Sequence, residues 1–368
     1  MKTKEAVIYE HNRPFVIETL ELEDPKEGEV LLRIVASGIC HSDHHVITGN
    51  YETPLPMVLG HEGGAVVEAL GPKVEHVKVG DHCIATWMPA CRRCYYCVEG
   101  MSYLCDRGKN LLMGTQPDGT FRFHKGSQDI GQMHFLGTFS EYVVVPEDSV
   151  VVIDRDLPLE KACITGCAVP TGFGSVTRRA QMRAGSTALI IGCGGVGVSA
   201  IQGARFSGAR MVIAADIVDE KLRMLGPFGV THTINNKKEN LVQKVMEITQ
   251  GVGVDYSFEA IGTPEAQHDA IEALRKGGIC VLIGVTPFSH DKILTTPAIL
   301  GLYSKSILGS LYGSCNTLTE IPHILQLYRD GKIKLNEMVT KEYRLEQVNE
   351  AFNDMLNGRN IRGVIRFD

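Results

Sequence analysis

The sequence predicts an α/β protein that combines a β-rich domain with a doubly wound domain built on a parallel sheet. Up to about residue 151, short runs of alternating apolar and polar residues lie between turns rich in Gly, Pro and Asp. From residue 185, buried strands alternate with helical segments. The length of 368 residues suits about two domains, and 44% hydrophobic with 22% charged residues is typical of globular chains.

Strand patterns dominate the first half of the chain. The runs 29–38, 64–71 and 139–147 have the alternation and length of strands, and turn residues separate them. This pattern favours a compact antiparallel β domain. The segment 361–368 at the other end of the chain predicts one more short strand, which we expect to return to this first domain.

The second half alternates between strand and helix patterns, which predicts a parallel sheet covered by helices on both faces. The expected strands are 186–192, 209–216, 231–235, 254–262 and 279–285. Between them we expect helical segments that begin near Gly195 or cover 219–229, 238–251 and 264–278.

A glycine motif of the form G-x-G-x-x-G follows the first of these strands, at Gly192, Gly194 and Gly197. The first glycine allows a tight turn, the second allows a pyrophosphate to approach the backbone, and the third allows the helix to pack closely on the strand. The N-terminus of that helix then faces the phosphates. A lone motif of this kind is a weak signal, but its strand–turn–helix context is the one that a dinucleotide site requires.

Asp216 ends the next expected strand, at the distance where dinucleotide-binding folds place an acidic residue. Its carboxylate would bind both hydroxyls of an adenosine ribose and repel a 2′-phosphate. No Arg or Lys follows it immediately. The cofactor expected from these residues is therefore NAD rather than NADP.

Four of the eleven cysteines lie in one short segment, at Cys91, Cys94, Cys97 and Cys105. Four thiolates from one loop complete a tetrahedral zinc shell, which leaves no open position and so predicts a structural site. An iron–sulfur cluster also takes four thiolates, but no electron partner is evident. A redox centre would need only one C-x-x-C. We therefore interpret this segment as a structural zinc lobe.

A catalytic metal needs an open position, which one His and two Cys would leave. The sequence offers such residues in Cys40, His61 and Cys167, each in a glycine-containing segment. Sequence alone does not show that these three meet, and a single buried His or Cys is more often a core residue.

The chain's location and partners are constrained by its charge and cysteine content. A net charge of −6 argues against a nucleic-acid-binding surface, and no apolar run is long enough to span a membrane. The first 15 residues turn polar too early for a secretory signal. We therefore expect a cytoplasmic protein with reduced thiols, no nucleic-acid partner and no membrane partner.

Taken together, the motifs resemble the zinc-dependent alcohol dehydrogenases of the medium-chain dehydrogenase/reductase superfamily. The resemblance extends over essentially the whole chain and rests on GHEGGAVVEALG, the four-cysteine lobe, GCAVPTGFGS and GCGGVG, in that order. It implies a GroES-like catalytic domain of residues 1–168 and 312–368 around a Rossmann domain of residues 169–311. The segment GTQPDGTFRFH is most similar to bacterial aryl- and allyl-alcohol and nicotinoprotein enzymes.

The resemblance assigns roles residue by residue. It implies two zinc ions, of which the catalytic one is bound by Cys40, His61 and Cys167, with Asp43 and Glu62 behind these ligands. Ser42 would contact the substrate oxygen and His45 would end the proton relay. The residues implied at the cofactor are His41, Thr171, Lys221 and Arg362, besides the glycines and Asp216.

The same resemblance places aromatic residues around the alcohol, namely Tyr51, Trp87 and Phe135. Such walls favour bulky primary alcohols, either aromatic, allylic or medium-chain, that are converted to aldehydes. A polyol dehydrogenase, a glutathione-dependent formaldehyde dehydrogenase or a non-catalytic relative remain as alternatives. The family also implies a homodimer. His44 matches no role, and the other five cysteines are expected in the core.

Overall fold

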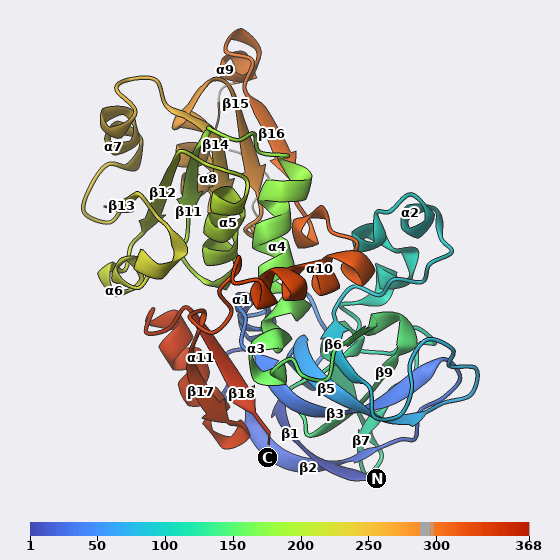
Figure 1. Ribbon diagram of the computed structural model, residues 1–368. Coiled ribbons are helices and arrows are strands. Elements are labelled where there is room, and N and C mark those ends of the chain that lie inside the picture. The colour runs from blue at the N-terminus through green and yellow to red at the C-terminus, as the bar shows by residue number, and fades with distance from the viewer. Residues whose placement is uncertain (288–294, 296, 368) are drawn as a thin grey trace.

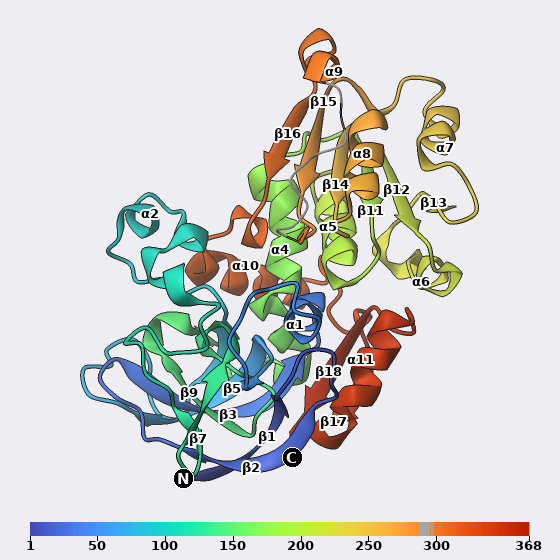
Figure 2. The ribbon, with the colours of Figure 1, turned by 180° about the vertical axis from the view of Figure 1, so that it is seen from behind.

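The structure is a computed structural model, and it describes residues 1–287, 295 and 297–367. Figures 1 and 2 show two domains, one built on a barrel and a mixed sheet and the other on a parallel sheet. The chain enters and leaves through the first domain, so both termini lie there. The expected α/β fold class is confirmed. The domain boundaries stay a prediction, and the expected 169–311 unit includes residues 288–294 and 296, which lie outside the described residues.

The first domain holds two sheets with the core between them. A closed barrel runs in the order β1 (Lys2–Ile8), β2 (Val16–Leu22), β7 (Phe123–Lys125), β8 (Gln128–Gln132) and β4 (Met57–Val58). The other sheet runs in the order β10 (Val150–Ile153), β6 (His82–Thr86), β5 (Glu62–Leu70), β3 (Glu29–Gly38), β18 (Arg362–Arg366) and β17 (Val339–Arg344), and β9 (Tyr142–Pro146) also pairs with β3.

The C-terminal strand returns to the first domain as expected. β18 pairs antiparallel with β3, with Ile365 opposite Ser37. Helix α11 (Val348–Leu356) packs its buried Val348, Ala351 and Phe352 against the apolar cluster of β1. This return places Arg362, at the start of β18, near the middle of the molecule.

The second domain contains the expected parallel sheet. Its strands run in the order β13 (His232–Asn235), β12 (Met211–Asp216), β11 (Thr187–Ile191), β14 (Val254–Glu259), β15 (Leu274–Leu282) and β16 (Ser306–Gly309). The helices of this half are α4 (Ala168–Gly174), α5 (Gly195–Phe206), α6 (Asp219–Arg223), α7 (Leu241–Ile248), α8 (Pro264–Glu272) and α9 (Pro297–Leu302).

Alternation along the central strand explains why helices cover both faces. Ala188 and Ile190 pack with α5, whereas Leu189 and Ile191 pack with α7 and α8 on the opposite face. Figures 1 and 2 show these helices on either side of the sheet. A strand that is buried at every position, as β11 is, needs cover on both of its faces.

Three of the expected helices are shorter than the sequence pattern indicated, and one of them, α7, covers only Leu241–Ile248 of the expected 238–251. The helix expected over 219–229 ends at Arg223, because Gly226 and Pro227 begin a separate 3-10 turn. The helix expected over 264–278 ends at Glu272, because Leu274 already pairs with Val254 in β15. Pairing within the sheet therefore overrides the helical pattern of that segment.

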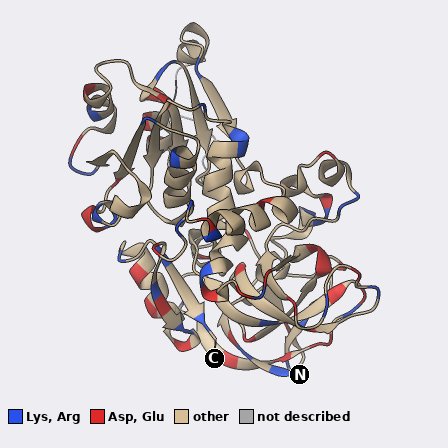
Figure 3. Cartoon of the chain, in the orientation of Figure 1, with Lys and Arg blue, Asp and Glu red and all other residues tan. Residues whose placement is uncertain are grey.

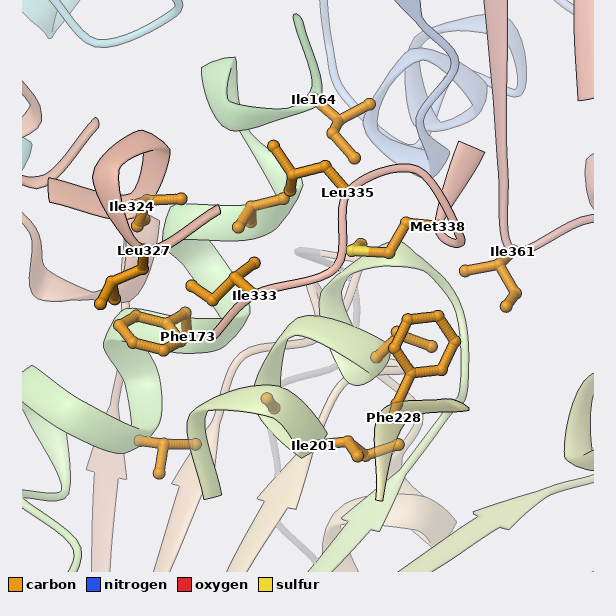
Figure 4. Close-up of a cluster of buried hydrophobic side chains, with 14 of the residues drawn as sticks. Ile164, Phe173, Ile201, Phe228, Ile324, Leu327, Ile333, Leu335, Met338 and Ile361 are labelled. Atoms are coloured by element: carbon orange, nitrogen blue, oxygen red, sulfur yellow. The ribbon is translucent and has the colours of Figure 1, made fainter. Parts of the chain in front are cut away.

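An apolar cluster between the domains fixes their relative placement. Figure 4 shows Ile164 near the top of this cluster and Ile201 of α5 near the bottom, with Phe173 and, on α10 (Thr317–Arg329), Ile324 at the left. The same cluster includes Ala36 of β3 and Ile84 of β6. Burial at about 25 cal/mol per Å² makes such a cluster a main contribution to the domain contact.

The remaining helices are short and lie near the site described below. They are α1 (His41–Ile47), α2 (Tyr95–Val98) and α3 (Leu159–Ala162). Lys and Arg alternate with Asp and Glu in both domains, as Figure 3 shows. No helix among the described residues has the length and apolar character that a membrane crossing requires.

Glu5 on β1 is a fully buried carboxyl group without a basic partner among the described residues. Its Oε2 accepts from the Leu20 N–H at 3.1 Å, and its Oε1 lies 3.3 Å from the Ser140 hydroxyl. That hydroxyl already donates to the Tyr142 carbonyl at 2.6 Å, so a neutral Glu5 has an acceptor for its own proton. Burial raises the pKa of Glu5 to about 8.

We predict that Glu5→Gln changes how stability depends on pH. A carboxyl whose pKa is raised in the fold stabilises the protein at low pH, and this contribution is lost as pH rises toward 8. The loss is about 1.4 kcal/mol for each pH unit above the unfolded-state pKa. We would measure the free energy of unfolding in urea at pH 5, 6.5 and 8. Relative to the natural protein, Glu5→Gln should become more stable at each step in pH. The control Glu21→Gln, which changes an exposed carboxylate, should show no such trend. Parallel pH profiles for all three proteins would contradict the prediction.

Candidate functional site

Cys40, His61 and Cys167 meet in one buried place, although they come from distant parts of the chain. Cys40 precedes α1, His61 precedes β5, and Cys167 lies between a 3-10 turn and α4. Their two sulfur atoms and one imidazole nitrogen lie within 4.8 Å of one another. The three candidate ligands that the sequence offered are therefore brought together.

Asp43 fixes the orientation of this group. Its carboxylate, fully buried, accepts from the Cys40 N–H at 3.1 Å and from the Gly60 N–H at 3.0 Å. It also lies 3.1 Å from His61 Nδ1, so this nitrogen carries the proton and Nε2 keeps a lone pair. His61 Nε2 is buried and has no hydrogen-bond partner among the described residues. A buried lone pair beside two cysteine sulfurs fits a zinc ion.

Ser42 and His45 lie on α1, next to these ligands. The Ser42 hydroxyl is 3.6 Å from Cys40 Sγ, and Ser42 lies close enough to Tyr51 to affect the pKa of its phenol. His45 Nδ1 lies 3.2 Å from the Asn50 amide, and its ring packs at 5.3 Å on Tyr51. Burial lowers the pKa of His45 and raises that of Tyr51. The Ser42 hydroxyl and the His45 ring therefore flank the same tyrosine.

Glu62 connects the ligand group to the C-terminal strand. Its Oε1 accepts from the Ala168 N–H at 2.8 Å, directly after Cys167. Both of its oxygens accept from the Arg362 guanidinium, and both side chains are buried. Burial raises the pKa of Glu62 to about 7, against the opposing charge of Arg362. The Arg362 side chain also lies against Gly195, at the start of α5.

Trp87 and His134 lie on the other side of His61. The rings of His134 and His61 are 5.4 Å apart, and Trp87 is 5.5 Å from His134. Trp87 Nε1 and His134 Nδ1 are both buried without a hydrogen-bond partner among the described residues. Burial lowers the pKa of His134 to about 3, so the ring is neutral. Aromatic rings thus flank the ligand group on both sides.

Phe135, which the resemblance places beside the alcohol, lies in the apolar core of the cysteine lobe. It is fully buried and packs with Met88, Leu111 and Tyr312 beneath the cysteine lobe. The preceding residue, His134, faces His61. Both residues have left-handed backbone, with φ of 53° and 66°, so the chain turns sharply between them. The role of Phe135 as a pocket wall stays a prediction.

The four cysteines of the lobe converge as their spacing predicted. Their sulfur atoms lie within 4.8 Å of one another, and none forms a disulfide. Cys91 and Cys97, and likewise Cys94 and Cys105, are 3.9 Å apart between sulfurs. Four thiols around one point fit the tetrahedral shell of a structural zinc ion. In Figure 1 the lobe, with α2, extends from the side of the first domain.

The glycine motif forms the turn between β11 and α5. Gly192 has φ of +93°, a conformation that favours glycine. A Cβ on Gly197 would come within 1.7 Å of the Gly192 carbonyl oxygen, so the helix packs on the turn only because this side chain is absent. Beside Gly194 there is open space. These positions have the conformations that the motif requires, and their contact with a cofactor stays a prediction.

The residues expected around the rest of a dinucleotide lie near this turn. Asp216 ends β12, and its carboxylate accepts from the N–H groups of Cys193 at 2.8 Å and Val218 at 3.0 Å. Lys221 on α6 lies near Gly358. His41 is exposed at the start of α1.

Thr171 and His44 complete the residues singled out from the sequence. The Thr171 hydroxyl, on α4, is buried and has no hydrogen-bond partner among the described residues. A polar ligand atom would satisfy it. His44 is half-buried with its ring 6.2 Å from that of His41, and we assign it no role.

Sequence reasoning missed three residues of this site. Asn50 contacts His45, His134 contacts His61, and Tyr312 packs on Trp87 at 4.6 Å. His134 directly precedes Phe135, which the sequence did select. The sequence did not show the turn at these two residues, which brings His134 beside His61. For Tyr312, which lies far along the chain, no local signal was available.

Two family models match the chain. The alcohol dehydrogenase GroES-like domain matches residues 26–155, and the zinc-binding dehydrogenase matches residues 195–329. The first model thus covers part of the β-rich half with Cys40, His61 and the cysteine lobe. The second covers most of the parallel-sheet half, beginning inside the glycine motif.

Similar proteins match along the whole chain. The chain is 44% identical to the NDMA-dependent alcohol dehydrogenase of Amycolatopsis methanolica over 367 residues, with 99% of each chain covered. It is 41% identical to alcohol dehydrogenase B of Mycobacterium tuberculosis, covering 100% of this chain and 99% of the other. The crystal structure of benzyl alcohol dehydrogenase from Acinetobacter calcoaceticus superposes with a TM-score of 0.94 at 30% identity, with both chains fully covered.

Proposed function

The chain belongs to the zinc-dependent alcohol dehydrogenases of the medium-chain dehydrogenase/reductase superfamily, and from this premise we propose that it oxidises bulky primary alcohols to aldehydes with NAD. Cys40, His61 and Cys167 are the proposed ligands of the catalytic zinc. The cysteine lobe is the proposed structural zinc site. The observation that carries the proposal is the buried His61 Nε2, which has no partner and lies beside two sulfurs.

Zinc would polarise the alcohol oxygen and lower its pKa, and NAD would accept the hydride. The residues of the chain supply geometry and proton transfer. Asp43 contacts His61 Nδ1 and so turns the other ring nitrogen, Nε2, toward the two sulfurs. Glu62 holds the backbone directly after Cys167. Both carboxylates thus orient ligands without contacting substrate.

The proposed path for the alcohol proton runs along α1. Ser42 lies beside the ligand group, with its hydroxyl 3.6 Å from Cys40 Sγ. His45 follows one turn later on the same side of the helix, where its ring is half-buried. The lowered pKa of His45 keeps the imidazole neutral near pH 7, so it can accept a proton. We propose that the proton leaves the alcohol at Ser42 Oγ and moves outward to His45.

The proposed substrate size rests on the rings around the ligand group. Tyr51 lies on the Ser42 side, and Trp87 and His134 lie on the His61 side. Such walls gain free energy by burying apolar surface, at roughly 25 cal/mol per Å². A benzylic, allylic or medium-chain alcohol offers that surface, whereas ethanol and sorbitol offer little.

We predict that Ser42→Ala lowers kcat for benzyl alcohol by about 100-fold or more, the usual scale for a positioned proton-transfer group. Ser42→Thr keeps the hydroxyl and is the matched control, which should retain most of the activity. The natural protein should prefer benzyl alcohol over ethanol, sorbitol and S-hydroxymethylglutathione in kcat/KM. Full activity of the alanine variant would refute the relay, and faster turnover of sorbitol or the glutathione adduct would refute the substrate class.

The proposed preference for NAD rests on Asp216. Its carboxylate is held at the end of β12 by two backbone N–H groups, so it cannot swing away from a ribose bound there. A 2′-phosphate at that place would bring two negative charges together in a partly buried site. One relative is named for NDMA, so assays should run with free NAD and with NDMA.

We predict that Asp216→Asn lowers the ratio of the affinities for NADH and NADPH by about tenfold or more. The variant loses the repulsion between the carboxylate and the 2′-phosphate, and about 1.4 kcal/mol of repulsion corresponds to a tenfold change in affinity. Fluorescence titration with each nucleotide measures this directly. The exposed Glu220→Gln on α6 is the control and should leave the ratio unchanged. Equal affinity of the natural protein for both nucleotides would rule out the assigned role of Asp216.

We also propose a homodimer that forms along β16. This strand is the edge of the parallel sheet, with no neighbour on its outer side among the described residues. Apolar side chains next to it are exposed, with Leu302 at 82%, Leu311 at 44% and Tyr303 at 43%. An open edge with apolar flanks is suited to pairing with a second copy.

Sedimentation equilibrium of the full chain should give twice the mass of one chain. Leu302→Glu should shift the equilibrium toward monomers, because it places a charge in the proposed contact. A monomeric natural protein at micromolar concentration would contradict the proposal. The cytoplasmic location expected from the reduced cysteines stays a prediction.

A further inference from the structure

Tyr312 is a buried residue that the mechanism above does not use. It follows β16, where the chain leaves the parallel sheet and passes between α4 and the cysteine lobe. Its side chain is 1% exposed and its backbone is left-handed, with φ of 51°. A tyrosine held in this conformation costs free energy, so the surrounding contacts must hold it there.

Within the described part of the chain, the hydroxyl of Tyr312 has one partner, the carbonyl of Gly166. Gly166 directly precedes Cys167. A Cβ on Gly166 would lie 2.8 Å from the Ala85 carbonyl oxygen and 3.2 Å from Glu62 Cα. This part of the backbone therefore lies against β6 and against the start of β5, which His61 directly precedes. The Tyr312 hydroxyl therefore fixes the peptide group on one side of Cys167.

Cys167 depends on such contacts because regular helix geometry stops there. The 3-10 turn Cys163–Gly166 ends before it and α4 begins after it, and Cys167 itself has φ −149° and ψ −70°. On the far side, Glu62 accepts from the Ala168 N–H at 2.8 Å. Tyr312 on the preceding peptide and Glu62 on the following one thus hold Cys167 between them.

The segment that begins with Tyr312 also holds α4. A Cβ on Gly313 would come within 2.0 Å of the Pro170 carbonyl oxygen, and one on Gly174 would come within 2.2 Å of Cys315 Sγ. Cys315 Sγ in turn donates to the Pro170 carbonyl at 3.5 Å. This close packing prevents the segment from sliding along the helix, so the Tyr312 hydroxyl stays aligned with Gly166.

The ring of Tyr312 is connected to His61 through two other rings. It packs on Trp87 at 4.6 Å, Trp87 packs on His134 at 5.5 Å, and His134 lies 5.4 Å from His61. The same ring belongs to the small apolar core of the cysteine lobe, with Met88, Cys105 and Leu111. One side chain thus contacts the backbone of one ligand, the aromatic residues beside another, and the lobe.

We propose that Tyr312 is a positioning residue of the catalytic metal site, which holds the Cys167 thiolate in place through the Gly166 carbonyl. The inference rests on the proposed function, because it takes Cys167 as a ligand of the catalytic zinc. Removing the hydroxyl frees the peptide before Cys167, so the thiolate binds metal less tightly. The lobe ligands do not depend on this hydrogen bond.

The test uses Tyr312→Phe in the full-length, zinc-loaded protein, with the rate of zinc release to an excess of chelator as the readout. The matched control is Tyr343→Phe, since Tyr343 is also a buried tyrosine of the first domain, and its hydroxyl contacts Asp354 and Asn360 instead. The zinc ion whose release accompanies loss of activity should leave about 3- to 10-fold faster from Tyr312→Phe, the effect of losing one buried hydrogen bond. The other zinc ion should leave at the natural rate.

Cobalt substitution at the catalytic site adds a second readout. The thiolate-to-cobalt absorption bands of Tyr312→Phe should shift, and those of Tyr343→Phe should not. Unchanged release rates and bands, equal acceleration of both zinc ions, or the same change in the control would each overturn the proposal. A natural protein that holds fewer than two zinc ions would instead contradict the proposed function on which the inference rests.

Discussion

The candidate site depends on one buried carboxylate, Asp43, which accepts three hydrogen bonds at once. Two come from the backbone at Cys40 and Gly60, and the third comes from the His61 imidazole. The two backbone bonds fix where the carboxylate lies, and the third then decides which imidazole nitrogen keeps its lone pair. A buried carboxylate without these donors would be costly, so the arrangement is stable only as a whole.

The rest of the site is held by contacts between segments that are far apart in sequence. Glu62 joins the N-terminal half to Arg362 in the last strand, and Arg362 lies against the first turn of α5. The apolar cluster of Figure 4 holds the same two domains together around α4. Because α4 begins directly after Cys167, domain packing and ligand geometry are connected. A change in either one would alter the place where substrate and cofactor meet.

Much of the fold and of the candidate site could be predicted from the sequence, because the patterns that indicate them lie within short segments. Strand alternation located β3, and the glycine spacing located the turn before α5. The cysteine spacing predicted a convergent lobe, which needs only one short loop. The sequence could not show that His134 packs beside His61, because the chain turns there through two successive left-handed residues, 134 and 135. Nor could it pair Glu62 with Arg362, whose contact exists only in the folded chain.

Asp43 prepares His61 as a metal ligand, and this is the central claim to test. The decisive measurement is the zinc content of the natural protein and of Asp43→Asn after dialysis against a chelator that the natural protein resists. Loss of a carboxylate that hydrogen-bonds to a metal-binding histidine typically lowers metal affinity by about 10- to 100-fold. We predict two zinc ions per chain in the natural protein and only the lobe ion in the variant. Two retained ions in both proteins, or an absent ion in the natural protein, would contradict the account.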